Sequence, residues 1–334
     1  MRICIFGAGA VGGHFAARLA AAGHQVSAVA RGANLAALRE RGIELRVADK
    51  RFTGKVKASD RPGDLGEQDL VISTLKAPTL PALAQGIAPL LGKHTKVIFA
   101  LNGVPWWYAQ HIGARPAPPD LGKLDPHGAL AKAVASERIL GGVIYSSNEM
   151  IAPGIVVNQS PYDARLVIGA IDDRQDGEIE SLRVSLREAG FDSPPVADIR
   201  KAVWDKLVRN MSGSTLCLLT GQKLTVVVAD PALAEITRRL LLEGIDIAVA
   251  HGMDVSAALP QPGGPRRRVP DHKPSILQDY ELGRAMEIEA IILATQSFAR
   301  IAKVPSPTLD VIAAVATRMA IAKGLYASEA GAGS

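Results

Sequence analysis

Cysteine is scarce in this sequence. Of 334 residues only Cys4 and Cys217 are cysteine, and they lie far apart. Because they form no C-x-x-C pair, the sequence suggests neither a disulfide framework nor a zinc site, and we expect no bound metal. The cytoplasm is the compartment expected for such a chain.

Long hydrophobic runs are also lacking, since no stretch reaches the roughly 20 apolar residues that a membrane span requires. Met1 and Arg2, followed by apolar and alanine-rich residues, superficially resemble a signal peptide. Glycines at turn spacing, with His14 and Arg18 inside the stretch, argue against export. We therefore expect an ordinary soluble protein without a membrane partner.

Aromatic residues make up only 4% of the chain, and the basic residues behind a net charge of +5 are scattered. Nucleic-acid-binding surfaces cluster basic residues, so we expect no nucleic-acid partner. A basic surface that attracts anionic ligands fits better. The length and a hydrophobic fraction of 48% allow two domains with a sizeable core.

Glycine is plentiful, and it is concentrated first near the N-terminus. The apolar run Arg2–Phe6 is followed by G-x-G-x-x-G at residues 7–12, and then by the alanine-rich stretch His14–Ala22, ended by Gly23. The motif alone is weak evidence, but a strand before it and a helix after it are the context of dinucleotide binding. We therefore predict a strand, a phosphate-binding turn and a helix here.

The three glycines of the motif would do different things. Gly7 permits a tight turn, Gly9 lets a pyrophosphate approach the backbone, and Gly12 lets the helix pack closely on the strand. The pyrophosphate would lie at the helix N-terminus, where free N–H groups and the helix dipole favour an anion. The structural alternative is a glycine-rich turn that binds no nucleotide. The candidate loop comprises Gly7, Ala8, Gly9, Ala10, Val11 and Gly12.

The second predicted strand, Gln25–Ala30, ends at a basic residue. NAD-preferring sites usually offer Asp or Glu to the adenine ribose, whereas this chain offers Arg31. A guanidinium suits a 2′-phosphate, so the sequence predicts NADPH rather than NADH. A solvated arginine at a strand end is the alternative.

Strands and helices alternate up to about residue 190, which predicts a parallel, doubly wound sheet. Asp69–Leu75 and Lys96–Leu101 are typical of buried strands. Ligands bind beyond the carboxyl ends of such strands, which makes Leu75, Lys76, Asn102 and Gly103 candidate cofactor contacts. For Asn102 and Gly103 a simple turn is an equally good interpretation. Further strands are expected at Ile43–Val47, Phe52–Val56, Ile139–Tyr145, Gly154–Asn158 and Arg165–Ile168, and helices at Asn34–Arg41, from Lys76 to Leu91 and at Glu178–Glu188.

The composition changes at residues 192–195, where two prolines follow Asp192 and Ser193. We place the domain boundary there and predict a nucleotide-binding domain at 1–194, a helical domain at 195–327 and a frayed tail at 328–334. The stretch Pro260–Pro274 is expected to be a loop, with Arg266–Arg268 solvated rather than ligand-binding. Helical spacing of apolar residues predicts helices at Ile199–Met211, Pro231–His251, Ser275–Leu282 and Glu287–Lys303.

Three polar features stand out in these helices. Lys206 and Asn210 are four residues apart and share a helix face, and a lysine there can protonate a carbonyl oxygen during hydride transfer. An ordinary surface lysine is the alternative. Ser275, with Gln278 three residues on, has the form of an N-cap. Glu287 would lie in a first helical turn, where an acid is favourable without any catalytic role.

Taken together, these residues resemble the ketopantoate reductase (2-dehydropantoate 2-reductase) family of NADPH-dependent enzymes of pantothenate synthesis. The resemblance covers nearly the whole chain. Its motifs are Gly7–Gly12, Leu75-Lys76, Asn102-Gly103, Trp204-Asp205-Lys206-Leu207, Asn210, Lys273-Pro274-Ser275, Leu277-Gln278-Asp279 and Glu287-Ile288.

The resemblance implies a Rossmann domain followed by an all-helical domain, with the active site in the cleft between them, and often a homodimer. It implies that Lys206 is the general acid and Glu287 the essential acidic residue. Arg31 would bind the 2′-phosphate, and Lys76 and Asn102 would be polar residues on the cofactor side of the site. Asn210 and Ser275 would contact the substrate, a small 2-oxo acid.

Two departures from the family pattern put the substrate in doubt. Ser214 stands where the family often has asparagine. His272 stands at a second position, where some members use asparagine to bind the substrate. Reduction of ketopantoate to pantoate is the leading expectation, with a paralogous reductase of another small oxo acid as its rival. A non-catalytic NADPH-binding protein is the third hypothesis, and the presence of both Lys206 and Glu287 argues against it.

Overall fold

The computed structural model describes residues 1–160, 164–259 and 271–327, and it divides into two compact units. Unit 1 comprises Met1–Leu101 and His127–Ile199. Unit 2 comprises Asn102–Pro126 and the chain from Arg200 onward. No pattern in the sequence indicated that residues 102–126 would group with the later helices. The predicted tail at 328–334 and Arg266–Arg268 lie outside the described residues.

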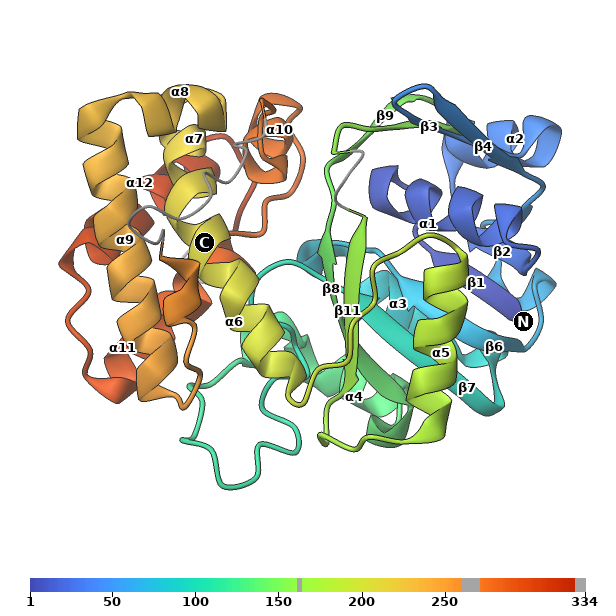
Figure 1. Ribbon diagram of the computed structural model, residues 1–334, viewed down its shortest axis with the longest axis horizontal. Helices are drawn as coiled ribbons and strands as arrows, with labels where there is room; N and C mark the ends of the chain where they lie inside the picture. The colour runs from blue at the N-terminus through green and yellow to red at the C-terminus, as the bar shows by residue number, and fades with distance from the viewer. Residues whose placement is uncertain (161–163, 260–270, 328–334) are drawn as a thin grey trace, which may run out of the picture. The chain divides into compact units, whose positions relative to one another are not determined.

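Unit 1 contains a twisted sheet with strand order β11-β8-β7-β6-β1-β2-β5 (Figure 1). Neighbouring strands are parallel except for β11, which runs antiparallel to β8. β1 is an interior strand with β6 on one side and β2 on the other, so the strand order reverses there. The strands are β1 (Arg2–Phe6), β2 (Gln25–Val29), β5 (Lys57–Ser59), β6 (Gln68–Ser73), β7 (Leu91–Ala100), β8 (Ile139–Tyr145) and β11 (Arg165–Ala170).

Helices cover this sheet on both faces, which confirms the predicted doubly wound class (Figure 1). α1 and α5 share one apolar core with the sheet, in which the Phe15 and Phe191 rings are 5.0 Å apart. The central strands are buried on both faces because helices cover both of them. The helices of unit 1 are α1 (Ala10–Ala21), α2 (Gly32–Arg41), α3 (Pro81–Gly86), α4 (Ala129–Ala133) and α5 (Gly177–Glu188).

A second sheet, which the sequence did not indicate, packs against α1. Its strand order is β4-β3-β10-β9, and α1 contacts all four strands. Three strands predicted along with those of the main sheet therefore belong to this separate sheet, because they supply the apolar cover for the outer face of α1. The four strands are β3 (Ile43–Val47), β4 (Lys50–Gly54), β9 (Asn148–Ala152) and β10 (Ile155–Asn158).

Two predicted helices of unit 1 differ from the structure. α1 begins at Ala10, not at His14, because Gly7 turns the chain with φ +102° and Gly9 already takes the cap position. The helix predicted from Lys76 to Leu91 is broken into short pieces, of which α3 is the longest. Pro78, Pro81 and Pro89 each lack a backbone N–H, and each begins a new helical turn.

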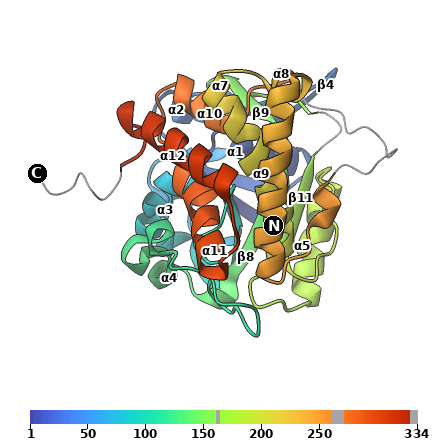
Figure 2. The same ribbon diagram turned by 90° about the vertical axis from the view of Figure 1, so that its left-hand side faces the viewer.

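Unit 2 is helical (Figures 1 and 2). The predicted helices are present within a few residues, but α7, α8 and α12 were not predicted. The first two are six residues each, too short to show a periodic pattern. The helices are α6 (Ile199–Arg209), α7 (Thr215–Thr220), α8 (Leu224–Ala229), α9 (Pro231–Ala250), α10 (Ser275–Glu281), α11 (Ala294–Ala302) and α12 (Pro307–Ala322), with π-helical turns at Asn210–Ser214 and Glu289–Leu293.

Aromatic and guanidinium contacts hold residues 102–126 in unit 2. The buried Arg200 of α6 donates from Nε to the Tyr108 carbonyl at 3.1 Å, and its guanidinium lies over the Trp107 ring. Trp204 donates from Nε1 to the Tyr108 hydroxyl at 2.7 Å, and both rings pack edge-on against Phe298. These contacts explain why a segment that precedes much of unit 1 in the sequence belongs to unit 2.

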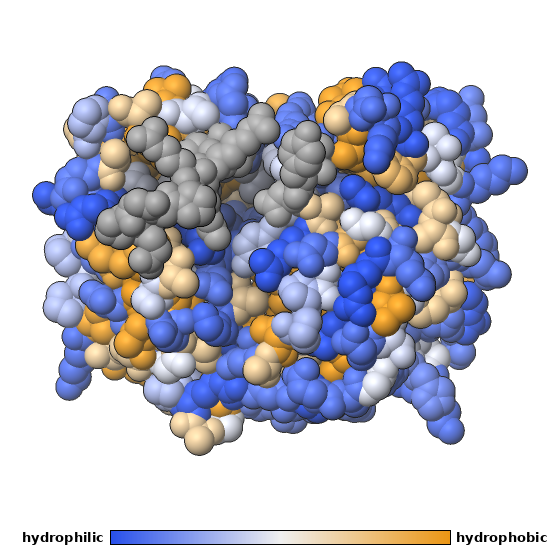
Figure 3. Space-filling model, viewed as in Figure 1, coloured by the Kyte–Doolittle hydropathy of each residue, from blue (hydrophilic) through white to orange (hydrophobic). Residues whose placement is uncertain are grey.

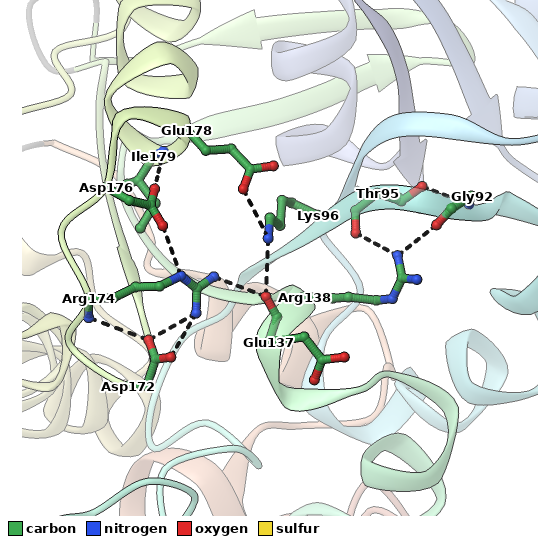
Figure 4. A network of polar contacts seen from close by, with 10 residues as sticks. All are labelled: Gly92, Thr95, Lys96, Glu137, Arg138, Asp172, Arg174, Asp176, Glu178 and Ile179. Atoms are coloured by element: carbon green, nitrogen blue, oxygen red, sulfur yellow. Dashed lines mark hydrogen bonds and ion pairs between the residues drawn. The ribbon is translucent and has the colours of Figure 1, made fainter.

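Polar contacts close the amino-terminal edge of the main sheet (Figure 4). Arg174 binds the carboxylates of Asp172 and Asp176 and donates to the Glu137 carbonyl, while Lys96 pairs with Glu178 at 3.1 Å. These bonds join β7 and α5 to the turn before β8.

The surface in Figure 3 is mainly hydrophilic with scattered apolar residues. Among the described residues no helix combines the length and the apolar character needed to cross a membrane.

Candidate active site

The glycine loop of unit 1 follows β1, an interior strand of the main sheet. A Cβ on Gly12 would collide with the Gly7 carbonyl oxygen, so the close packing predicted for this glycine is present. A Cβ on Gly9, in contrast, would meet no heavy atom within 4 Å. Gly9 therefore leaves open space beside the backbone at the start of α1. That is the opening through which a pyrophosphate can reach the backbone.

Neighbouring strands and loops fix this turn. Thr74, which follows β6, donates its hydroxyl to the Gly7 carbonyl at 2.5 Å, and the Leu75 side chain fills the space beside Gly7. Asn34 donates to the Ala8 carbonyl at 2.6 Å and accepts from the Gly154 amide at 2.8 Å. Thr74 and Asn34 were missed by sequence reasoning, because neither belongs to the glycine motif and each acts through a distant backbone atom.

The residues of unit 1 fit a dinucleotide. The first turn of α1 carries no acidic side chain, so nothing there competes with an anion for the positive end of the helix. Arg31 is exposed at the end of β2, as the N-cap of α2. Lys76 follows β6 and is half-buried. The glycine loop, Arg31, Leu75 and Lys76 thus follow the carboxyl ends of three adjacent parallel strands.

Unit 2 brings three of the predicted residues into direct contact. The Lys206 ammonium donates to Asn102 Oδ1 at 2.7 Å, and Asn102 Nδ2 donates to Glu287 Oε2 at 3.3 Å. The two bonds define the orientation of the amide, because its oxygen faces the cation and its NH2 group faces the carboxylate. Lys206 is half-buried, whereas Glu287 is 3% exposed. The predicted proton donor thus contacts a predicted residue of the cofactor side directly.

Close backbone packing sets the position of Asn102. Gly103 has φ +74°, and a Cβ there would collide with the Ala290 backbone. The Val104 amide donates to the Ala290 carbonyl at 2.7 Å. Only glycine combines this backbone angle with so close an approach. The Asn102-Gly103 pair therefore packs directly against the helical segment that follows Glu287. A simple turn would not require this contact.

Two π-helical turns flank this cluster and contact each other. One is Asn210–Ser214, which continues α6 after Lys206, and the other is Glu289–Leu293, which follows Glu287. Such turns often occur at functional sites, because one extra residue redirects the side chains beyond it. Asn210 and Ser214 are both half-buried within the first turn. The helix predicted at Ile199–Met211 ends inside the first of these turns, and the helix predicted at Glu287–Lys303 runs through the second without a break. Apolar spacing does not reveal one inserted residue.

Ser275 is the first residue of α10, which contacts the turn Asn210–Ser214, and His272 lies three residues before it. The N-cap predicted for Ser275 is wrong: Pro274 holds the cap position in an extended conformation, and Ser275 is the first helical residue. Gln278 instead donates to the Lys273 carbonyl at 2.8 Å. His272 is half-buried, and burial lowers its pKa. Ser275 is thus on an element that contacts the turn containing Asn210.

A cavity of about 490 Å³ lies elsewhere, at the amino-terminal edge of the main sheet. It is lined by charged residues that include Lys93, Lys96 and Glu178, and by none of the predicted site residues. The carboxyl edge, where the glycine loop lies, is the edge that binds ligands in sheets of this kind. We therefore do not assign the cavity to the candidate active site.

Comparisons with known proteins identify the family of this chain. The sequence profile described as "Ketopantoate reductase PanE/ApbA" matches residues 3–173, and its C-terminal counterpart matches residues 198–320. The chain is 38% identical over 328 residues to a 2-dehydropantoate 2-reductase of Mesorhizobium japonicum, covering 98% of this chain and all of the relative. This chain belongs to the ketopantoate reductase family. The family resemblance predicted from the sequence is confirmed, and the protein is an oxidoreductase by family.

Solved structures of the ketopantoate reductase family share the fold. A protein of Ralstonia solanacearum MolK2, assigned to the ketopantoate reductases, has a TM-score of 0.84 at 34% identity, covering 97% of this chain and 99% of that one. A D-mandelate dehydrogenase solved with NADH and anilino(oxo)acetate has a TM-score of 0.80 at 19% identity, covering 98% of this chain and all of that one. At that identity the likeness shows the fold alone.

Proposed function

We propose that this protein reduces a small 2-oxo acid to the 2-hydroxy acid with NADPH, and that the substrate is 2-dehydropantoate, which becomes pantoate. The observation that supports the proposal most is the cluster in which Asn102 lies between Lys206 and Glu287. A protein that only bound a nucleotide would need no lysine held by a half-buried amide.

Each residue of the cluster has a role in the proposed reaction. NADPH, when bound, supplies the hydride that the carbonyl carbon takes up. Negative charge then develops on the carbonyl oxygen, and Lys206 neutralises it by donating a proton, which gives the hydroxyl group. Asn102 keeps the lysine side chain in one orientation, and Glu287 holds the amide and anchors a hydroxyl group of the substrate. Asn210 and Ser275 bind the substrate carboxylate and carbonyl.

The cofactor preference rests on unit 1. Gly9 leaves the backbone open to a pyrophosphate, with Gly7 to Gly12 forming the loop, and Leu75 and Lys76 border it on the next strand. Arg31 is exposed at the end of β2, where an NAD-preferring protein would usually present an acid. Its guanidinium would pair with the 2′-phosphate of NADPH. Gly103 has an indirect role, because it allows the Asn102 loop to pack against the Ala290 backbone.

A second candidate is a reductase of another oxo acid on the same scaffold. Ser214 and His272 favour it, since they differ from the family pattern next to Asn210. The D-mandelate dehydrogenase with the same fold was solved with NADH and anilino(oxo)acetate, which carries an aromatic ring, so an aryl 2-oxo acid belongs in the substrate survey. We further propose, from the family resemblance, that the protein is a cytoplasmic homodimer. Light scattering on the purified protein tests the dimer.

A steady-state survey tests the function. NADPH and NADH oxidation are measured with 2-dehydropantoate, phenylglyoxylate and several aliphatic 2-oxo acids. We expect the highest kcat/KM with NADPH and 2-dehydropantoate. A higher value with another oxo acid would select the second candidate. NADPH binding without turnover of any oxo acid would contradict both and leave a binding protein.

A further inference from the structure

The segment after α12 is bound to both sides of Glu287. The Met286 amide, directly before Glu287, donates to the Leu325 carbonyl at 3.1 Å. Two residues after Glu287, the Glu289 carboxylate accepts a short hydrogen bond from the Tyr326 hydroxyl. All of these residues belong to unit 2. The chain around Glu287 thus has partners that lie about forty residues later in the sequence.

Lys323, at the start of the same segment, makes further contacts with the end of α10. Lys323 donates from Nζ to the Tyr280 carbonyl at 2.5 Å, and its ammonium lies 4.1 Å from the centre of the Tyr280 ring. Tyr280 is in the last turn of α10, just before the irregular stretch that leads to Glu287. Residues 282–287 form neither a helix nor a strand. The amides of residues 282–284 still donate to carbonyls of α10, whereas the Met286 amide, next to Glu287, donates to Leu325.

We propose that residues Lys323–Tyr326, named here the C-terminal clasp, position Glu287 for the reaction. The inference rests on the proposed function. Glu287 receives the amide of Asn102, and Asn102 holds Lys206. A shift of Glu287 is therefore passed to the proton donor. Tyr326 is a positioning residue, which acts through Glu289 and the backbone rather than by touching the substrate.

The geometry explains why the clasp would matter more for turnover than for stability. Tyr326 is half-buried at the end of the described chain, so the loss of its hydroxyl removes the hydrogen bond to Glu289 and leaves the ring in place. A displacement near 1 Å at a catalytic group can cost roughly a hundredfold in rate, whereas one hydrogen bond at a chain end contributes little to folding. The effects on rate and on thermal stability should therefore separate.

The test is Tyr326→Phe, assayed well below its melting temperature with the best oxo acid of the wild-type survey. We expect kcat to fall by about tenfold, with NADPH affinity within twofold of wild type. Glu289→Ala should have the same effect, and Tyr326→Phe should add nothing in the Glu289→Ala background, because both remove the same bond. Glu289→Gln keeps an acceptor and should restore most of the turnover. Arg318→Met, an exposed change on α12, is the matched control and should leave kcat unchanged.

Hydrogen exchange makes the result independent of turnover. Tyr326→Phe should speed amide exchange at Met286–Ala290, and Arg318→Met should not. If the wild type turns over no oxo acid, the proposed function fails while the exchange experiment still tests the clasp. Wild-type kcat in Tyr326→Phe, or unchanged exchange at Met286–Ala290, would overturn the clasp and leave the proposed function standing.

Discussion

Lys206 and Asn102 meet through one hydrogen bond, in which the lysine ammonium donates to the amide oxygen at 2.7 Å. The two residues are 104 positions apart in the sequence. The lysine comes from α6, and the asparagine from a segment that docks on a different helix of unit 2. The bond limits where the ammonium can lie, which a proton donor requires.

Replacing Lys206 tests the proton donor. Lys206→Ala should lower kcat by about a hundredfold or more, with NADPH affinity nearly unchanged, because the proton is needed only in the transition state. Steady-state kinetics and NADPH titration measure the two effects. A Lys206→Ala enzyme with near wild-type kcat on its best substrate would transfer the assignment to another residue, with Lys76 the first to examine.

The cofactor preference depends on Arg31. Arg31→Asp should reverse it, since a carboxylate repels the 2′-phosphate and can accept from a ribose hydroxyl. Loss of a charge-assisted contact should weaken NADPH binding by roughly tenfold or more. Fluorescence titration with NADPH and NADH measures both affinities, and Arg41→Asp, a change elsewhere on α2, is the matched control. Equal NADPH affinity in wild type and Arg31→Asp would remove Arg31 from the site.

Gly103 is expected to be essential for turnover although it carries no functional group. Gly103→Ala places a Cβ against the Ala290 backbone at a positive φ, so the Asn102 loop must move. We expect kcat to drop about tenfold or more, with NADPH binding retained. Gly113→Ala is a suitable control, because Gly113 also has a positive φ but its nearest neighbour is only the Arg115 side chain at 3.7 Å. Similar kinetics for both variants would show that the docking is not needed.

Substrate choice should respond to Ser214 and His272. Asparagine is common at the family position of Ser214 and is used by some members at that of His272. Ser214 lies in the same turn as Asn210, and His272 precedes α10, which contacts that turn. Ser214→Asn and His272→Asn should change the KM ratios among oxo acids while kcat on the preferred one changes little. If either variant loses turnover with every oxo acid while NADPH still binds, that residue has a catalytic role instead.

The buried His14 should make stability depend on pH. Burial, with a smaller effect of Arg18, lowers its pKa to about 3 from an ordinary 6.5. Between these values the unfolded chain binds a proton that the folded chain does not, so the free energy of unfolding falls as the pH is lowered. The slope from this residue approaches about 1.4 kcal/mol per pH unit. Urea unfolding of His14→Gln between pH 7 and pH 4 should show a shallower decline than wild type.

An exposed histidine provides the control for that experiment. His94→Gln should leave the pH dependence of unfolding as it is in the wild type, because the His94 ring is exposed in the folded protein. Parallel curves for wild type, His14→Gln and His94→Gln would mean that other groups cause the acid sensitivity.

Local sequence patterns determined much of this protein. Strands such as Arg2–Phe6 and Ile139–Tyr145 were predicted with their observed ends, because a short and largely uncharged apolar run is typical of a buried strand. The glycine spacing of residues 7–12 likewise specified the turn, since only glycine permits its backbone angle and close contacts. These signals are local, so one sequence carries them in full.

The tertiary structure decided how distant segments combine. The second sheet around α1, the membership of residues 102–126 in unit 2, and the attachment of residues 323–326 beside Glu287 all depend on contacts between segments far apart in the chain. The π-helical turn after Lys206 contains one inserted residue, which cannot be recognised from the spacing of apolar residues in the sequence. The sequence named Lys206, Asn102 and Glu287 separately, and only folding joined them, because a hydrogen bond depends on distances that spacing along a chain does not encode.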